Sequence, residues 1–170
     1  MIALHKSSGG IRPIAMGYTW RRICTKYAHL FGILKMSSYL SAIQLEVGVP
    51  GGAEAAFHSL RRYVNTMGDD DIIVKLDFAN AFNTLRRDTL METIAKFIQE
   101  IYCFVHATYS GEPILQFMNL IIRSLEGPQQ GDSLASLEFC WSIHPLLKRL
   151  VAELRLGFMD DITLRENTLP

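Results

Sequence analysis

The sequence predicts an α+β fold, and two patterns of apolar residues carry this prediction. Apolar residues recur at helical spacing in four stretches, which are residues 19–35, 51–64, 88–108 and 132–153. Short apolar runs bounded by Gly, Pro or acidic residues predict strands at residues 72–77, 113–117, 119–125 and 154–164. Segments of both kinds favour a small antiparallel sheet with helices on one face. The hydrophobic content of 49% favours a folded core over disorder.

The N-terminal segment, residues 1–16, is predicted to form two short extended pieces around a turn signal at residues 7–10. Lys6 and Arg12 flank this turn. A guanidinium group offers a planar fork of donors that matches phosphate, and a lysine offers a point charge. The segment is therefore either a candidate phosphate-binding site or a solvated hairpin that carries two cations.

The first two predicted helices each carry an apolar stripe. In residues 19–35 the stripe consists of Ile23, Tyr27, Leu30, Phe31 and Leu34. Residues 36–50 are a predicted connector, and Gly51 and Gly52 open the second helix. The predicted buried face of that helix consists of Ala53, Ala56, Phe57, Leu60 and Val64. A polar turn at residues 65–71 then marks a predicted boundary between two subdomains, residues 1–65 and residues 66–170.

The remaining elements follow from the same signals. Residues 72–77 are predicted to be a buried strand that ends at Asp77. Asp88 is predicted to cap the next helix, whose apolar face consists of Leu90, Ile94, Phe97, Ile98 and Ile101. After two short strands, Asp132 is predicted to cap a long helix that Pro145 kinks.

Two adjacent acids, Asp160 and Asp161, lie between the apolar runs of residues 154–158 and 162–164. This arrangement is typical of a β-hairpin with carboxylates at its tip, and in isolation it is most simply a solvated turn. Carboxylates at strand ends in two segments can also share divalent metals, and Asp77 supplies a second such segment. Mg²⁺ suits a site of this kind because it takes carboxylate and phosphate oxygens and keeps waters. The spacing alone does not decide between the two interpretations.

Four segments resemble the motifs of reverse transcriptases, and they occur in the order of that family. The segments are residues 7–14, with Gly9-Gly10 before Arg12-Pro13-Ile14; residues 76–83, Leu-Asp-Phe-Ala-Asn-Ala-Phe-Asn; residues 126–134, with Gln129-Gln130-Gly131-Asp132; and Phe158-Met159-Asp160-Asp161. The residues of these segments are most similar to those of enzymes from non-LTR retrotransposons. Ser133 and Ser136 stand where the family pattern has prolines.

The resemblance implies a right-hand polymerase, with fingers at residues 1–65 and a palm at residues 66–170. It implies two Mg²⁺ ions, with Mn²⁺ as an alternative, bound by the catalytic acids Asp77, Asp160 and Asp161. It also implies a set of nucleotide-binding residues, which are Lys6, Arg12, Phe78, Phe82, Gln130 and Gly131. In this set Phe82 would pack under the sugar and disfavour a 2′-hydroxyl, and Gln130 would contact the template base pair.

The activity implied is RNA-directed DNA synthesis, with an RNA template, a DNA primer and deoxynucleoside triphosphates as partners. The resemblance also implies a thumb after Asp161, which we expect elsewhere in a longer parent protein. Because phosphate contacts supply much of the affinity for a duplex, we expect weak activity of these residues alone. Two alternatives stay open. One is a transposon remnant that binds nucleic acid or protein without catalysis, and the other is an RNA-dependent RNA polymerase.

Composition bears on partners and location. Residues 1–64 hold eight Lys and Arg against two Asp and Glu, whereas residues 65–170 hold nine against fifteen. This asymmetry favours a phosphate-facing half and a metal-collecting half. The widely spaced cysteines Cys24, Cys103 and Cys140 fit reduced thiols in an intracellular protein, either nuclear or cytoplasmic. No run approaches ~18 uncharged apolar residues, so no membrane partner is expected.

Overall fold

The computed structural model describes residues 1–5, 9–41 and 43–167, so Lys6 lies outside the described residues. The chain divides into two units, and each is built from two separate stretches of sequence. The first unit comprises Met1–Gly32 and Asn80–Phe139, and the second comprises Ile33–Ala79 and Cys140–Pro170. Both contain helices and small antiparallel sheets, which confirms the α+β class. The division into fingers and palm at residue 65 stays a prediction.

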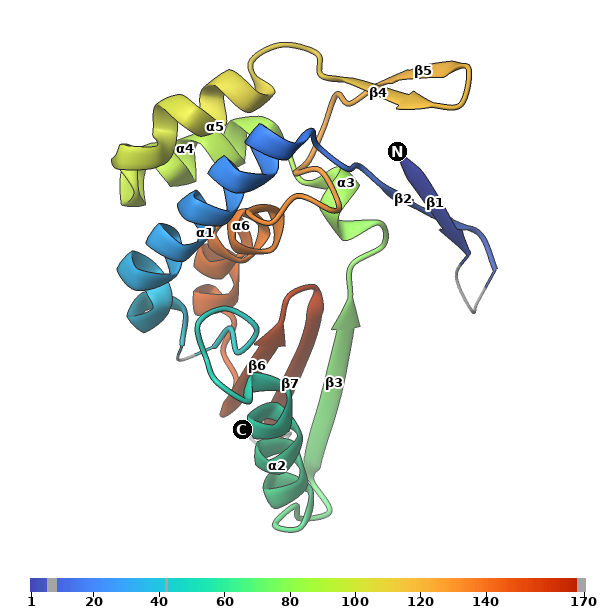
Figure 1. Cartoon of the computed structure of the whole chain (residues 1–170). Coiled ribbons are helices and arrows are strands. Elements are labelled where there is room, and N and C mark those ends of the chain that lie inside the picture. The colour runs from blue at the N-terminus through green and yellow to red at the C-terminus, as the bar shows by residue number, and fades with distance from the viewer. Residues whose placement is uncertain (6–8, 42, 168–170) are drawn as a thin grey trace. The chain divides into compact units, whose positions relative to one another are not determined.

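The strands of the first unit form two separate hairpins (Figure 1). Strand β1 (Ile2–His5) pairs antiparallel with β2 (Ile11–Ile14), as the sequence predicts. Strand β4 (Ile114–Phe117) pairs in the same way with β5 (Leu120–Arg123). Their exposed apolar residues show that neither hairpin contributes much to a core.

The core of the first unit is helical. It contains α3 (Ala81–Thr84), α4 (Arg87–Phe97), the 3₁₀ turn η1 (Gln99–Ile101), α5 (Tyr102–Tyr109) and the start of α6 (Ala135–Arg149). Most of the predicted apolar face of residues 90–101 is buried, with Leu90 and Ile98 fully inaccessible. The predicted cap at Asp88 is wrong, because α4 begins one residue earlier and Asp88 instead pairs with Arg86 at 2.9 Å.

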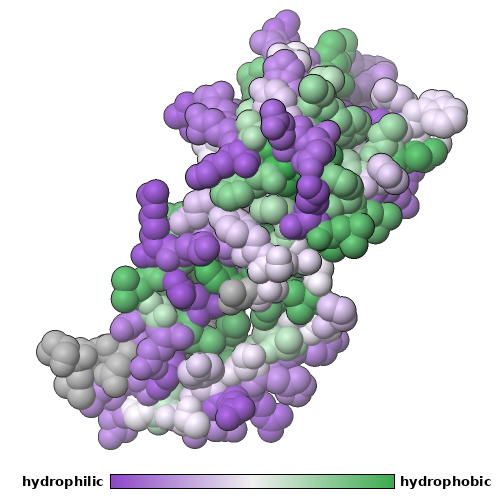
Figure 2. All heavy atoms as spheres, turned by 90° about the vertical axis from the view of Figure 1, so that its left-hand side faces the viewer, coloured by the Kyte–Doolittle hydropathy of each residue, from purple (hydrophilic) through white to green (hydrophobic). Residues whose placement is uncertain are grey.

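Helix α1 (Thr19–Leu40) extends five residues beyond its predicted end at residue 35. Most of its apolar stripe is exposed rather than packed, with exposed fractions from 52% at Ile23 to 83% at Leu34, whereas Phe31 is half-buried. The buried side of α1 carries Thr25, Ala28, Met36 and Leu40. Figure 2 views the side on which α1 lies and shows hydrophobic atoms at the surface among hydrophilic ones. Helical spacing identifies residues that share a face, but it does not say what covers that face.

The second unit contains a three-stranded sheet in the order β3-β7-β6, with both pairs antiparallel. Its strands are β3 (Asp71–Asp77), β6 (Leu154–Phe158) and β7 (Asp161–Asn167). Residues 72–77 form a strand as predicted, but its predicted burial is wrong, because β3 is an edge strand and leaves Ile72 45% exposed. The predicted burial of the α2 (Gly52–Val64) stripe is also wrong, since Phe57 is 60% exposed.

The end of β7 is fixed by ion pairs within the second unit. Arg165 Nη2 lies 2.6 Å from Asp71 Oδ2, and Arg165 Nη1 also pairs with Glu153. The hydrogen bond from Arg165 lowers the pKa of Asp71, so both groups stay charged at neutral pH. These contacts hold β3 and β7 in register at the end of the sheet opposite to the predicted catalytic acids.

Helix α6 is shorter than its predicted range of residues 132–153. Asp132 precedes it, and the Asp132 Oδ1 atom accepts a hydrogen bond from the backbone N–H of Leu134 at 3.0 Å. Pro145 lies inside the helix, as predicted. None of the helices in the described part of the chain is both long enough and apolar enough to cross a membrane.

Candidate functional site

The three predicted catalytic acids lie at one end of the sheet in the second unit. Asp77 is the last residue of β3, and its cross-strand partner is Asp161, the first residue of β7. Asp160 lies in the two-residue turn between β6 and β7. Figure 1 shows this turn at the same end of the sheet as the arrowhead of β3. The antiparallel register thus brings together carboxylates that are 83 and 84 positions apart in the sequence.

A buried glutamine supports the turn that carries Asp160. Gln44 is fully inaccessible, and its Nε2 atom donates to the Met159 carbonyl oxygen at 3.2 Å. Its Oε1 atom accepts a hydrogen bond from the Cys140 thiol at 3.5 Å. Met159 itself has a φ of 54°, in the left-handed region that costs a non-glycine residue roughly 1 kcal/mol. The strained backbone is therefore held by a side chain from a distant part of the chain.

Backbone bonds extend this support to strand β6. The N–H of Gly157 donates to the Ile43 carbonyl at 2.7 Å, and the N–H of Leu45 donates to the Gly157 carbonyl at 2.8 Å. A Cβ atom on Gly157 would approach the side-chain amide of Gln44 to about 3 Å. A larger residue at this position would therefore push the Gln44 amide out of its place by a few tenths of an ångström.

Lys75 dominates the electrostatics around the acids. Its Nζ atom lies 2.9 Å from Asp161 Oδ1, and this hydrogen bond raises the pKa of Lys75. The charge of Asp77 contributes in the same direction. Like charges directly opposite each other destabilise a pair of strands, so Lys75 offsets the repulsion between Asp77 and Asp161. Both partners of this ion pair are more than half exposed, and solvent weakens it accordingly.

The acids fit a Mg²⁺ site in their chemistry but not in the placement of their side chains. Three carboxylates are the hard oxygen ligands that Mg²⁺ prefers. Within residues 1–5, 9–41 and 43–167, however, no three His, Cys, Asp or Glu side chains are grouped so that they could hold one ion. Asp161 is turned toward Lys75 instead. Binding of a metal would therefore require the Asp161 carboxylate to leave Lys75.

A cavity of about 170 Å³ lies beside these residues in the second unit. Its walls come from α2, from β6 and from the Lys75–Asp161 pair, with Phe57, Leu60 and Phe158 among the apolar residues. The predicted catalytic end of the sheet thus adjoins a concave surface that is partly apolar and partly charged.

Of the predicted nucleotide-binding residues that the structure describes, Arg12, Phe82, Gln130 and Gly131 lie in the first unit. Arg12 is exposed on β2, opposite Leu4. The Gln130 carbonyl accepts a hydrogen bond from the Ala15 N–H at 2.6 Å, which ties the Gln130-Gly131 segment to the end of β2. Gly131 has a φ of 101°, and a Cβ there would lie 2.9 Å from the Ala15 oxygen. This close approach explains the glycine without reference to a ligand.

Two phenylalanines complete the predicted set. The Phe82 ring stacks on Phe139 with 4.8 Å between centroids and 15° between planes. It is half-buried, so its packing contact accounts for part of its presence at this position. Phe78 belongs to the second unit, directly after Asp77, and is also half-buried.

A buried network that sequence reasoning missed holds the loop before Gln130. The Gln129 N–H donates to the Tyr109 hydroxyl at 3.3 Å, and that hydroxyl donates to Glu138 Oε2 at 3.1 Å. The Arg87 guanidinium lies 4.8 Å from the centre of the Tyr109 ring. Burial raises the pKa of Glu138 to about 8, so this carboxyl is mostly protonated at neutral pH. An acidic residue inside the apolar run of residues 134–141 was the one signal for it in the sequence.

Gln44 left no comparable signal, because it lies in a predicted connector and its partners are far away in the sequence.

A scan against protein-family models finds no model that matches the chain, and a search of curated proteins finds no similar protein.

Proposed function

We propose that this chain is the core of an RNA-directed DNA polymerase that transfers nucleotides to a primer 3′-hydroxyl. The observation that carries the proposal is the register of the sheet, in which Asp77 lies opposite Asp161 and Asp160 occupies the adjoining turn. Carboxylates at strand ends, of which Asp161 lines a cavity, suit a site for phosphoryl transfer. The resemblance of four segments to reverse transcriptases supports the same reading.

In this proposal two bound Mg²⁺ ions would lower the pKa of the primer hydroxyl and neutralise charge on the leaving pyrophosphate. Asp77, Asp160 and Asp161 would hold these ions, and the Gln44 bond to the Met159 carbonyl would fix the turn that carries Asp160. Arg12 would hold the triphosphate of the incoming nucleotide through its planar fork of donors. The template RNA would select that nucleotide by base pairing.

A second candidate is a nucleic-acid or protein binding module without catalysis. The Lys75–Asp161 ion pair favours it, because one ligand of the proposed metal site is already engaged. The serines at positions 133 and 136 favour it as well, since they replace prolines of the family pattern.

Phe82 argues against the third candidate, an RNA-dependent RNA polymerase, because its bulk would exclude the 2′-hydroxyl of a ribonucleotide. Improved ribonucleotide use by an active Phe82→Ala variant would agree with that sugar-gate role.

The test is primer extension on an RNA template with deoxynucleotides and Mg²⁺ or Mn²⁺, with and without an added thumb. Asp160→Asn removes one proposed ligand, and Asp69→Asn is the matched control in an exposed turn of the same unit. We expect extension that the added thumb strengthens, that Asp160→Asn abolishes and that Asp69→Asn leaves unchanged. Absence of extension by folded protein under every condition would refute the polymerase and favour the binding module.

A further inference from the structure

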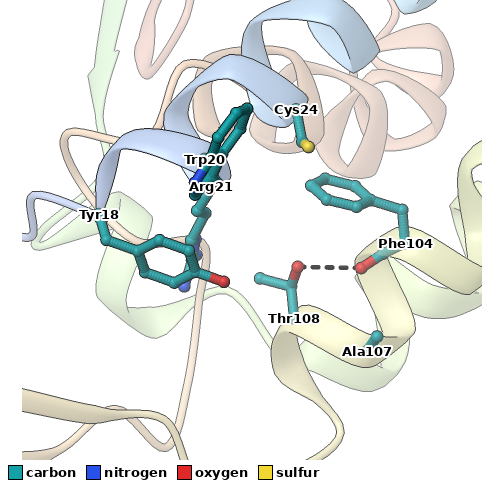
Figure 3. A pocket seen from close by; sticks show the side chains of 7 residues that line it. All are labelled: Tyr18, Trp20, Arg21, Cys24, Phe104, Ala107 and Thr108. Atoms are coloured by element: carbon teal, nitrogen blue, oxygen red, sulfur yellow. Dashed lines mark hydrogen bonds between the residues drawn. The ribbon is translucent and has the colours of Figure 1, made fainter.

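The first unit contains a second concave surface, a cavity of about 290 Å³ that adjoins α1 and α5. Figure 3 shows Tyr18 and Trp20 on the α1 side of this cavity and Phe104 and Thr108 on the α5 side. The Thr108 hydroxyl donates to the Phe104 carbonyl at 2.9 Å, so its polar end is engaged within its own helix. The cavity therefore presents aromatic rings together with polar groups.

The rings on the α1 side are unusually accessible. Trp20 is 73% exposed and Tyr18 is 72% exposed, although large aromatic side chains normally bury most of their surface. Arg21 forms part of the wall, but its guanidinium is already held by Asp132, with Nη2 to Oδ2 at 3.0 Å. The rings are thus available to a flat ligand, whereas the cation inside the cavity is not.

Exposed cations on α1, outside the lining of the cavity, favour an anionic ligand. Residues 1–45 contain no Asp or Glu, and they contain six Lys and Arg, of which Arg22 and Lys26 are exposed on α1. At 100° per residue, the exposed surface of α1 passes from Trp20 through Tyr27 to Lys26. Tyr27 is 74% exposed and adds a third accessible ring on this path. Aromatic rings beside cations are the elements with which proteins hold single-stranded nucleic acid.

We propose that this cavity binds an unpaired base of a single-stranded nucleic acid. The base stacks on Trp20 and Tyr18, and the neighbouring phosphates cross α1 to reach Lys26 and Arg22. A proline-rich peptide also docks on aromatic grooves, but it carries no phosphates to pair with the exposed cations of α1. The inference rests on the proposed function in one respect, because a polymerase must hold an unpaired template strand. It requires no catalysis.

The test measures binding of a labelled oligothymidylate in EDTA to the full chain carrying Asp160→Asn, so that catalysis does not contribute. We expect Trp20→Ala and Trp20→Leu to weaken binding about 5- to 150-fold, which corresponds to ~1–3 kcal/mol per stacked base. Trp20→Phe should keep most of the affinity. Ile121→Ala shortens a side chain that is 71% exposed on β5 of the same unit. This variant is the matched control and should bind the oligothymidylate as tightly as the parent does.

Two exposed thiols give a second measurement. Cys24 lines the cavity, and Cys103 is exposed on α5 outside the set of lining residues. Bound oligothymidylate should slow alkylation of Cys24 and leave that of Cys103 unchanged.

Equal binding of an abasic oligonucleotide would overturn the inference, because it would show that only the phosphates are recognised. Full affinity in Trp20→Leu would also overturn it and would indicate an apolar ligand. Binding of a polyproline peptide that depends on Trp20, together with oligonucleotide binding that does not, would assign the cavity to a peptide. Because these measurements exclude metal and use an inactive variant, their failure is distinct from a failure of primer extension.

Discussion

The raised pKa of Glu138 predicts that stability falls as pH rises through neutrality. The carboxyl is fully buried, its folded-state pKa is about 8, and its ordinary value is 4.5. The folded state therefore keeps a proton that the unfolded chain has released, so the stabilisation is fully present below pH 4.5 and is lost as pH rises through 8. At about 1.4 kcal/mol per pH unit, the whole effect is roughly 5 kcal/mol.

The useful window lies between about pH 6.5 and pH 8, where this group alone removes about 1.5 to 2 kcal/mol. Below that window His144 acts with the opposite sign, because its burial lowers its pKa to about 4 and folding releases its proton. Above that window the Cys140 thiol complicates the curve, since burial raises its pKa. The Glu138→Gln variant keeps the shape of the side chain and cannot ionise, so its difference from the parent isolates the carboxyl.

The assay is urea denaturation of the parent, Glu138→Gln and Tyr109→Phe at several pH values within the window. We expect Glu138→Gln to gain about 1.5 to 2 kcal/mol on the parent as pH rises from about 6.5 to 8. Tyr109→Phe should be less stable by about 1–3 kcal/mol, because it leaves the Gln129 N–H without its partner. Its loss of stability with rising pH should be at least as steep as the parent's, because the hydrogen bond from Tyr109 lowers the pKa of Glu138. A constant difference between parent and Glu138→Gln across the window would refute the reasoning.

Three further predictions concern the sheet and the core. Lys75→Gln should free Asp161 and tighten Mg²⁺ binding about 1.5- to 5-fold by calorimetry, whereas weaker binding would give Lys75 a supporting role. Leu90→Ala should cost about 2–5 kcal/mol in urea denaturation because the side chain is fully buried, and a cost below about 1 would contradict that burial. Gly127→Ala should displace the loop around Gly127 or unfold the protein, since the added Cβ would lie 1.8 Å from the backbone oxygen of Phe82. An unchanged melting temperature would contradict this contact.

Local signals in the sequence were sufficient for most of the elements. The hairpin at residues 154–164 follows from apolar runs on both sides of an acidic turn, and the structure forms β6 and β7 there. The strand that ends at Asp77 follows from its apolar run in the same way. Boundaries were less certain, because propensity alone does not decide where a helix ends, and α1 continues to Leu40.

Burial was harder to predict than secondary structure. The stripes of α1 and α2 have correct helical spacing, but Leu34 and Phe57 are exposed. Periodicity shows which residues share a face of a helix and does not show whether another element covers that face. The support of the candidate site was harder still. Gln44 contacts Met159 across 115 positions, and no pattern of spacing or composition connects two residues so far apart. The positions of the acids could be predicted from the sequence, whereas the groups that hold them could not.

The pairing of β3 with β7 has a consequence for how this protein folds. The paired residues lie between 84 and 96 positions apart, from Asp77 and Asp161 to Asp71 and Asn167. Contacts between residues so far apart in the sequence form slowly, because closing the intervening loop costs entropy before the strand pairing can stabilise the chain. During synthesis β3 leaves the ribosome long before its partner exists, with Ile72 and Val74 on an unpaired strand. The acidic end of the sheet is therefore assembled late, and the interval before β7 arrives is when the nascent chain is most open to aggregation.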